Sequence, residues 1–399
     1  MTAQSVDTGV VITHALRTPI AKYLGSFADL SGADLGASVV RSLLERSGVD
    51  GGEVDEVFIG YGRQAGAGPN PARQISVRAG IPESTCATTV NMACGSGLKA
   101  IQLAADAIRL GRVDVAVAGG TETMSGLPYF LPKMRRGYRL GHAKVVDAMY
   151  QDGFHCPLAD MPMGATAEKL AQTMSISRAE QDEYALRSQQ LAAQAIEEGR
   201  FDDQLAPVEV KGRKGDVTVI EKDEHVRPST SLESLGKLPP VFDAENGTVT
   251  AGNASGITDG AAALLVMSAA KAEALGLEVL AHVGPSTQAG VDPTTMGIGP
   301  VPAIRDFCER YGRSLSDWDL IELNEAFAAQ VIACVRELDL PVDRMNVNGG
   351  AIALGHPIGC TGARIVVTLL HELKRRELSK GLATLCMSGG MGMASEFTR

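Results

Sequence analysis

The sequence predicts an α/β fold built from two similar halves. Short runs rich in β-branched residues alternate along the chain with longer runs rich in alanine and leucine, a pattern typical of strands and helices packed in layers. Runs such as Val115-Ala116-Val117-Ala118 are apolar throughout, which indicates largely buried strands. With 399 residues, 45% of them hydrophobic, the chain can bury a sizeable core.

Three pairs of segments indicate an internal duplication. The strand-like residues 54–60 resemble 317–323, and Ser96-Gly97-Leu98-Lys99 resembles Thr361-Gly362-Ala363-Arg364 at nearly the same offset. A third pair, 115–120 and 384–390, lies near the end of each half. Because similar offsets recur at separate places, we expect two repeated α/β halves.

The segment between the halves differs from them in its pattern of residues. It contains few buried-strand runs, a long amphipathic helix predicted over 178–198, and charged turns. We therefore expect an inserted loop domain over 125–243. The N-terminal half would comprise 1–124 and 244–272, and the C-terminal half 273–399.

Composition excludes several classes of protein. A net charge of −10 opposes sequence-independent binding to nucleic acid or to an anionic membrane. The N-terminus shows no secretory signal and no run is long enough to span a membrane, so we expect a cytoplasmic protein. Seven cysteines without paired short spacings indicate reduced thiols, and the absence of CxxC and HExxH patterns predicts no metal site.

One basic segment interrupts the acidic chain. It carries Lys133, Arg135, Arg136, Arg139, His142 and Lys144. Such a segment is either a solvated loop face or a contact with a phosphate-bearing ligand or a neighbouring subunit.

Cys94 is the first candidate catalytic residue. It lies where a strand-like stretch turns through glycines into a helix predicted over 98–110. The N-terminal end of a helix favours thiolate over thiol, which would make Cys94 a nucleophile. The alternative is a buried structural thiol, since free cysteine is among the most buried residue types.

The C-terminal half adds further candidates. His356, with glycines on both sides that we expect to leave it uncovered, is a candidate base because its unperturbed pKa lies near neutrality. Cys386 ends a strand-like run and could remove a proton next to a thioester carbonyl. Asn324 could hold a water for an oxyanion hole, or cap a helix N-terminus. Together these groups predict acyl transfer through a thioester.

At this point the chain resembles the thiolase family, which makes and cleaves 3-ketoacyl-CoA. The matching motifs, in family order, are 91–97 around Cys94, 324–327, 355–359 around His356 and 386–392. The resemblance covers nearly the whole chain. It implies a thiolase-like fold with duplicated halves in five αβαβα layers, an inserted loop domain that binds CoA, and a homodimer or homotetramer. It also implies CoA or acyl-CoA as substrate and no permanently bound cofactor.

The resemblance implies a role for each residue. Cys94 takes the acyl group, His356 activates it, and Cys386 moves the proton of the acetyl carbon. Asn324, through a water, forms one oxyanion hole with His356, and the backbone N–H groups of Cys94 and Ser388 form the other. The family usually has glycine at position 388, but a backbone donor does not depend on the side chain. Substrate- or CoA-binding positions implied by resemblance are Ser255, Phe327, Met163 and Arg227.

Chain-length preference stays open at this stage. Short-chain biosynthetic members carry His-Met-Gly where this chain reads Pro162-Met163-Gly164, as some degradative, β-oxidation members do. Residues 251–256 and 347–350 instead resemble the acetoacetyl-specific branch.

Three other functions compete. The segment 95–100 fits GxGxxA, so an NAD-binding oxidoreductase is a remote alternative, although a cysteine before the first glycine has no role in holding a pyrophosphate. A decarboxylating 3-oxoacyl condensing enzyme also acylates a cysteine, but it needs no base such as Cys386. A catalytically silent carrier or scaffold protein is disfavoured because all four candidate side chains are present.

Overall fold

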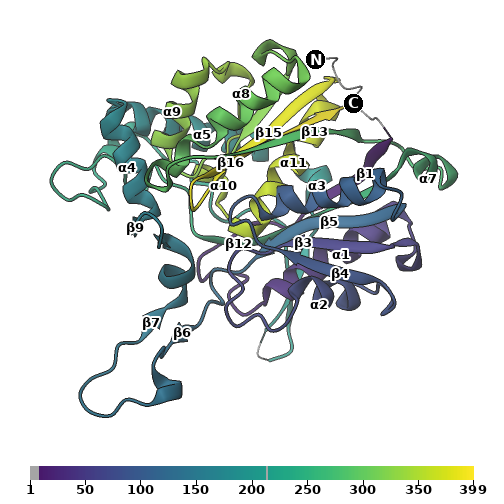
Figure 1. Ribbon diagram of the computed structural model, residues 1–399, viewed down its shortest axis with the longest axis horizontal. Helices are drawn as coiled ribbons and strands as arrows, with labels where there is room; N and C mark the ends of the chain where they lie inside the picture. The colour runs from purple at the N-terminus through teal and green to yellow at the C-terminus, as the bar shows by residue number, and fades with distance from the viewer. Residues whose placement is uncertain (1–8, 213) are drawn as a thin grey trace.

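Two half-sheets with the same strand pairing form the frame of the fold (Figure 1). The computed structural model describes residues 9–212 and 214–399. Each half-sheet has one parallel pair followed by two antiparallel pairs. The order is β3 (Glu56–Gly60), β5 (Val115–Glu122), β12 (Thr258–Ser268) and β1 (Val10–Arg17) in the first half, and β14 (Leu320–Leu323), β15 (Lys380–Met387), β16 (Met391–Thr398) and β13 (Ala281–Gly290) in the second.

The two half-sheets join and end differently. β1 and β13 pair over Val11↔His282 and Ile12↔Ala281, which links the halves into one 10-stranded sheet. The first half carries an additional parallel strand, β4 (Cys86–Val90), at its outer edge. The repeated pairing order is what an internal duplication would produce.

Helices cover both faces of each half-sheet. α3 (Ser96–Arg109) and α11 (Ile358–Arg375) pack against each other between the half-sheets. α1 (Gly32–Ser47) and α2 (Pro71–Arg78) cover the outer face of the first half, and α8 (Pro300–Tyr311), with α9 (Ala328–Leu338) beside it, covers the second (Figure 1). The predicted five-layer αβαβα fold is confirmed.

The two central helices touch backbone to backbone. A Cβ atom added to Gly97 would lie 2.7 Å from the backbone nitrogen of Ala363, and one added to Gly362 would lie 2.3 Å from that of Leu98. Any larger side chain at either position would force the helices apart. These glycines belong to the two segments, 96–99 and 361–364, that resemble each other in the sequence.

The segment 125–243 packs mainly on the second half. It includes α4 (Met163–Thr173) and α5 (Arg178–Glu197), which contact α9, so the long helix predicted over 178–198 is confirmed. An arm with β6 (Tyr129–Phe130) and β7 (Val146–Asp147) extends away from the body (Figure 1). The remaining elements are β2 (Ala21–Lys22), β8 (His155–Cys156), β9 (Met161–Pro162), β10 (Val208–Lys211), β11 (Val217–Ile220), α6 (Leu232–Gly236), α7 (Ala269–Ala274) and α10 (Ala351–Leu354).

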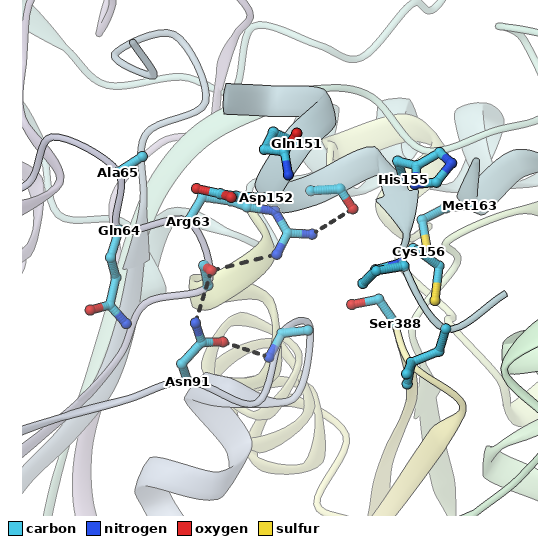
Figure 2. Close-up of a pocket in the computed structure, with 16 residues that line it drawn as sticks. Arg63, Gln64, Ala65, Asn91, Gln151, Asp152, His155, Cys156, Met163 and Ser388 are labelled. Atoms are coloured by element: carbon cyan, nitrogen blue, oxygen red, sulfur yellow. Dashed lines mark hydrogen bonds between the residues drawn. The ribbon is translucent and has the colours of Figure 1, made fainter. Parts of the chain in front are cut away.

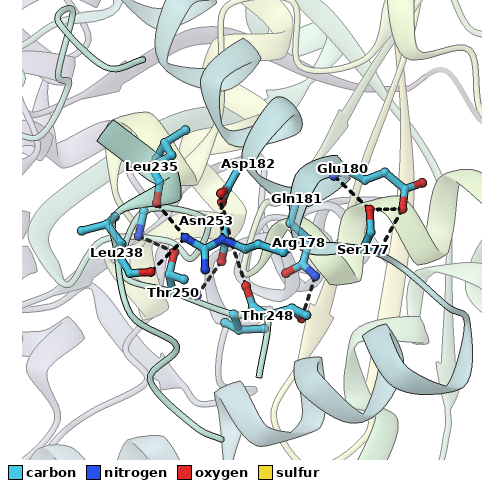
Figure 3. Close-up of polar contacts among 12 residues, drawn as sticks. Ser177, Arg178, Glu180, Gln181, Asp182, Leu235, Leu238, Thr248, Thr250 and Asn253 are labelled. Atoms are coloured by element: carbon cyan, nitrogen blue, oxygen red, sulfur yellow. Dashed lines mark hydrogen bonds and ion pairs between the residues drawn. The ribbon is translucent and has the colours of Figure 1, made fainter. Parts of the chain in front are cut away.

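A polar network ties this segment to residues 248–253, which lead into β12 of the first half (Figure 3). Asp182 on α5 accepts from Arg178 at 2.7 Å and from the side-chain amide of Asn253 at 2.9 Å. Gln181 donates to Thr248 at 2.8 Å. Because these bonds fix residues 248–253, they also fix the backbone that leads to Ser255.

Across residues 9–212 and 214–399, no helix is long and apolar enough to cross a membrane. The same residues hold no group of three or more His, Cys, Asp or Glu side chains arranged to bind a metal ion.

Candidate active site

A strained turn presents Cys94 at the N-terminal end of α3. Ala93, immediately before it, has a φ of 48°, a left-handed conformation that costs energy for a residue with a side chain. The hydroxyl of Ser96 fixes the turn, since it donates to the carbonyl of Ala93 at 2.6 Å and accepts from the N–H of Met92 at 2.9 Å. The turn therefore holds the Cys94 side chain at the helix end, where the sequence predicted it.

His356 reaches Cys94 from the other half of the fold. It lies just before α11, and its backbone N–H donates to the carbonyl of Gly256 at 3.0 Å. Its Nε2 lies 3.3 Å from the Cys94 sulfur, within hydrogen-bond reach.

Thr361 selects the tautomer of His356. The Thr361 hydroxyl donates to the carbonyl of Pro357 at 3.0 Å, and His356 Nδ1 lies 2.6 Å from the same hydroxyl oxygen. A hydroxyl has a single proton to donate, so Nδ1–H must be the donor in the second bond. His356 Nε2 is then left as a proton acceptor that faces the Cys94 thiol.

Burial keeps both members of this pair neutral. It raises the pKa of the Cys94 thiol, and the charge of Arg63 and the backbone N–H groups of Ser388 and Cys94 itself only partly oppose that rise. Burial, with the charges of Arg364 and Arg63, lowers the pKa of His356 to about 3. Two expectations are therefore wrong. The helix end was expected to favour a thiolate, but burial outweighs it and the resting Cys94 is a thiol. His356 was expected to be uncovered, but it is only 8% exposed.

Cys386 lies beside this pair, near the end of β15. It is fully buried in a cluster with Met296 and Ala326, against which Met163 and Phe327 pack. Burial raises the pKa of Cys386 well above its ordinary value, and the charge of a Cys94 thiolate raises it further. The two thiols, which come from different halves, therefore interact electrostatically.

Asn324 does not cap a helix. α9 begins at Ala328 with Phe327 as its capping residue, so the capping alternative is wrong. The Asn324 side chain is 1% exposed, and neither its oxygen nor its nitrogen has a hydrogen-bond partner among the described residues. A buried amide in this state needs a partner such as a water or a ligand.

A cavity of about 570 Å³ opens beside the turn that carries Cys94 (Figure 2). Its wall includes Ala93 and Ser388, together with polar side chains from residues 63–64, 91 and 151–155. This volume lies within the range of small-molecule sites.

Known proteins share this fold and this sequence across nearly the whole chain. The family models described as thiolase, N-terminal domain, and thiolase, C-terminal domain, match residues 10–270 and 277–399. The chain belongs to the thiolase family. It is 54% identical to an acetyl-CoA acetyltransferase of Pseudomonas aeruginosa, with 98% of this chain and 99% of that one covered.

Solved thiolase structures agree closely with the fold. The Bacillus anthracis acetyl-CoA acetyltransferase is 47% identical, has a TM-score of 0.95, and is matched over 98% of both chains. Human mitochondrial 3-ketoacyl-CoA thiolase in complex with CoA is 41% identical, has a TM-score of 0.94, and is likewise matched over 98% of both chains.

The other predicted positions of this thiolase are spread over a wider area. Met163 lines the cavity and contacts the Cys386 cluster. The N–H of Ser255 donates to the carbonyl of Ala326 at 3.0 Å, which places it next to the segment of Phe327. Arg227 is exposed and does not line the cavity. Among the described residues, no hydrogen bond links it to the catalytic cluster.

Sequence reasoning missed Glu122, a buried carboxylate at the end of β5. Its Oε2 accepts from the backbone N–H of Gly359 at 2.9 Å and of Gly62 at 3.2 Å, and its Oε1 accepts from the N–H of Arg63 at 3.2 Å. Glu122 thus holds the first turn of α11, next to His356, against the first half. Glu122 follows a strand-like run, 115–121, that carries no charge, and this was the available signal.

We predict a pH-dependent effect of Glu122→Gln on stability. Burial raises the pKa of Glu122 to about 7, whereas in the unfolded chain its ordinary value is 4.5. The native state therefore holds this proton more tightly, and wild-type stability falls relative to the variant as pH rises from about 4.5 to 7. Urea denaturation over this pH range measures the difference, and the titration of His356 cancels because both proteins contain it.

The matched control is Glu83→Gln, an exposed carboxylate, which should follow the wild type at every pH. A wild-type to Glu122→Gln difference that does not change with pH would contradict the assignment.

Proposed function

We propose that this thiolase cleaves and forms 3-ketoacyl-CoA through an acyl group carried on Cys94. As a member of the thiolase family, it is an acyltransferase that uses CoA as a substrate. The observation that carries the residue roles is the 3.3 Å contact between His356 Nε2 and the Cys94 sulfur, with Cys386 buried alongside.

In the first step His356 Nε2 takes the Cys94 proton as the sulfur attacks the 3-keto carbon of the substrate. The bond between carbons 2 and 3 then breaks, and the electron pair left on carbon 2 takes the proton of the Cys386 thiol. This step releases acetyl-CoA and leaves an acyl thioester on Cys94. The high pKa of Cys386 suits it to hold a proton until a carbanion-like centre forms.

In the second step the thiol of free CoA attacks the acyl-Cys94 thioester. The proton of the CoA thiol passes to the Cys386 thiolate left by the first step. The new acyl-CoA then leaves, and the protonated His356 returns its proton to Cys94. Backbone N–H groups of Cys94 and Ser388 would stabilise one developing oxyanion, and His356 with an Asn324-bound water the other. The unpartnered Asn324 amide supports the second assignment.

We propose acetoacetyl-CoA as one substrate. The bacterial relatives named acetyl-CoA acetyltransferase, at 54% and 50% identity over nearly the full length, support this choice. Where short-chain biosynthetic members carry a histidine, this chain has Pro162, which ends β9 and directly precedes α4. The cleavage reaction would then depend on His356 and Asn324 for oxyanion stabilisation.

We also propose the domain division and the assembly. The repeated strand pairing supports boundaries near residues 124, 244 and 273. β4 is one of the two edge strands of the sheet, and an edge strand can pair with a second copy. The arm exposes Leu140 to 99% and Met134 to 62%, as a contact surface between subunits would before assembly. These surfaces support a homodimer or homotetramer.

Substitution of the two cysteines should separate the half-reactions. Cys386→Ala should retain exchange of labelled CoA into acetyl-CoA, which needs only acyl transfer to Cys94, but lose acetoacetyl-CoA cleavage by about 10³-fold because the proton donor is missing. Cys94→Ala should lose both activities. Parallel exchange and cleavage assays measure this, and full cleavage activity in Cys94→Ala would contradict the proposal.

The basic arm offers a second test. If Arg135 and Arg136 contact a phosphate of CoA, replacing both with alanine should raise the KM for CoA by about tenfold and leave the oligomer mass unchanged. If they join subunits, the mass measured by light scattering should fall instead. An unchanged KM together with an unchanged mass would contradict both functions and leave a solvated loop face.

A further inference from the structure

Arg63 is a buried cation without an ion-pair partner among the described residues. Its side chain lies in the segment after β3 and the residue is only 5% exposed. Nη2 donates to the carbonyl of Gly153 at 3.1 Å, and Nη1 makes a long contact of 3.5 Å with the carbonyl of Gly62. Nε has no partner, and within the described residues no carboxylate oxygen lies within 4.0 Å of the guanidinium.

The guanidinium faces the cavity beside Cys94. Arg63, Ala93 and Ser388 all line the same cavity. Figure 2 shows the Arg63 side chain extending across this space, with bonds to backbone carbonyls on two sides. Cys94 itself does not line the cavity, but its neighbour Ala93 does. An acyl group on Cys94 that extends past Ala93 would enter a space with a positive charge in its wall.

The remaining wall of the cavity is part polar and part apolar, with Pro157, Leu158 and Met163 among its apolar members. Gln64, Asn91 and Gln151 contribute side-chain amides, and the Asn91 amide donates to the same Gly62 carbonyl at 3.1 Å. A pocket built only for an alkyl chain would present apolar side chains here. The lining instead suits an acyl chain with a polar end.

No carboxylate oxygen of the described residues contacts Arg63, although the charge of Arg63 partly opposes the rise that burial causes in the pKa of Glu122. Glu122 directs its oxygens to three backbone N–H groups, and burial raises its pKa to about 7, so it is not fully ionised at neutral pH. Asp152 lines the cavity but is exposed to solvent and makes no ion pair with Arg63. A buried, unpaired charge is costly, and an anionic ligand would remove that cost.

We propose that Arg63 binds a carboxylate at the far end of the acyl chain, so that this thiolase also cleaves 3-ketoacyl-CoA thioesters of dicarboxylic acids. The inference rests on the proposed function, since it concerns the substrate of the same site. A guanidinium presents its N–H donors as a planar fork that matches both oxygens of a carboxylate.

Two other anions could meet Arg63, a phosphate of CoA and the oxyanion that forms on the substrate carbonyl. Every CoA thioester shares both, whereas only a dicarboxylic substrate carries the terminal carboxylate. A comparison of substrates that differ only at that end therefore separates the three sources.

The experiment measures kcat/KM for cleavage of three substrates by wild type and Arg63→Gln. They are acetoacetyl-CoA, 3-oxohexanoyl-CoA, and the CoA thioester of 3-oxoadipic acid, which has the same length as the second but ends in a carboxylate. We expect the wild type to favour the carboxylated substrate over 3-oxohexanoyl-CoA by about 100-fold, because an uncharged end leaves Arg63 unpaired. Arg63→Gln should abolish this preference.

Two further variants serve as controls. Arg63→Lys keeps the charge without the fork and should retain part of the preference. Arg73→Gln removes another arginine that donates to two backbone carbonyls, both at 2.7 Å, but outside the cavity, and should leave the substrate ratios unchanged.

Equal losses on all three substrates in Arg63→Gln would overturn the proposal, because they would assign Arg63 to the oxyanion or to loop structure. A wild-type preference for 3-oxohexanoyl-CoA would also overturn it. The same three substrates can also be made with CoA that lacks its 3′-phosphate. If wild type and Arg63→Gln cleaved these forms equally well, Arg63 would bind that phosphate and the proposal would fail. Failure of wild type to cleave acetoacetyl-CoA or to acylate Cys94 would contradict the proposed function itself.

Discussion

The close contact between α3 and α11 is the constraint on which the active site depends. Gly97 and Gly362 let the two helices meet without intervening side chains. Each helix begins with a catalytic candidate, Cys94 before α3 and His356 before α11, so the contact brings both to one place. Glu122 reinforces this arrangement because it binds backbone N–H groups of both halves. A small change in helix spacing would separate the 3.3 Å pair.

The same contact determines the electrostatics of the site. Packing the helix ends between two half-sheets removes water from Cys94, His356 and Cys386, and burial is the largest cause of each pKa shift. Two neutral thiols and a neutral imidazole result, with Thr361 directing the imidazole lone pair at Cys94. Charge then develops only when substrate is bound, near donors already held in place. Arg63 is the exception, since it brings a fixed positive charge to the cavity wall.

The sequence predicted much of this architecture because duplication and glycine-rich motifs leave local signals. The α/β layers, the long helix near 178–198 and the turn at Cys94 follow from periodicity and from the order of glycines. The pairing of Cys94 with His356 was inferred first from the chemistry of the two side chains and then from family resemblance, since no local pattern encodes a contact across 262 positions. The roles of Glu122, Thr361 and Arg63 escaped prediction because each depends on neighbours brought together by folding. Local reasoning also misjudged the protonation state of Cys94, because a helix end can be predicted from the sequence whereas the depth of burial cannot.

The pH dependence of Cys94 alkylation tests this account most directly. Iodoacetamide would be reacted with the native protein over a range of pH, and the modified peptide that contains Cys94 would be quantified by mass spectrometry. A neutral thiol–imidazole pair predicts a rate that climbs about tenfold per pH unit through neutrality, because only the thiolate reacts. A rate that is already fast and constant from about pH 5 to 8 would reveal a thiolate–imidazolium pair and contradict the account.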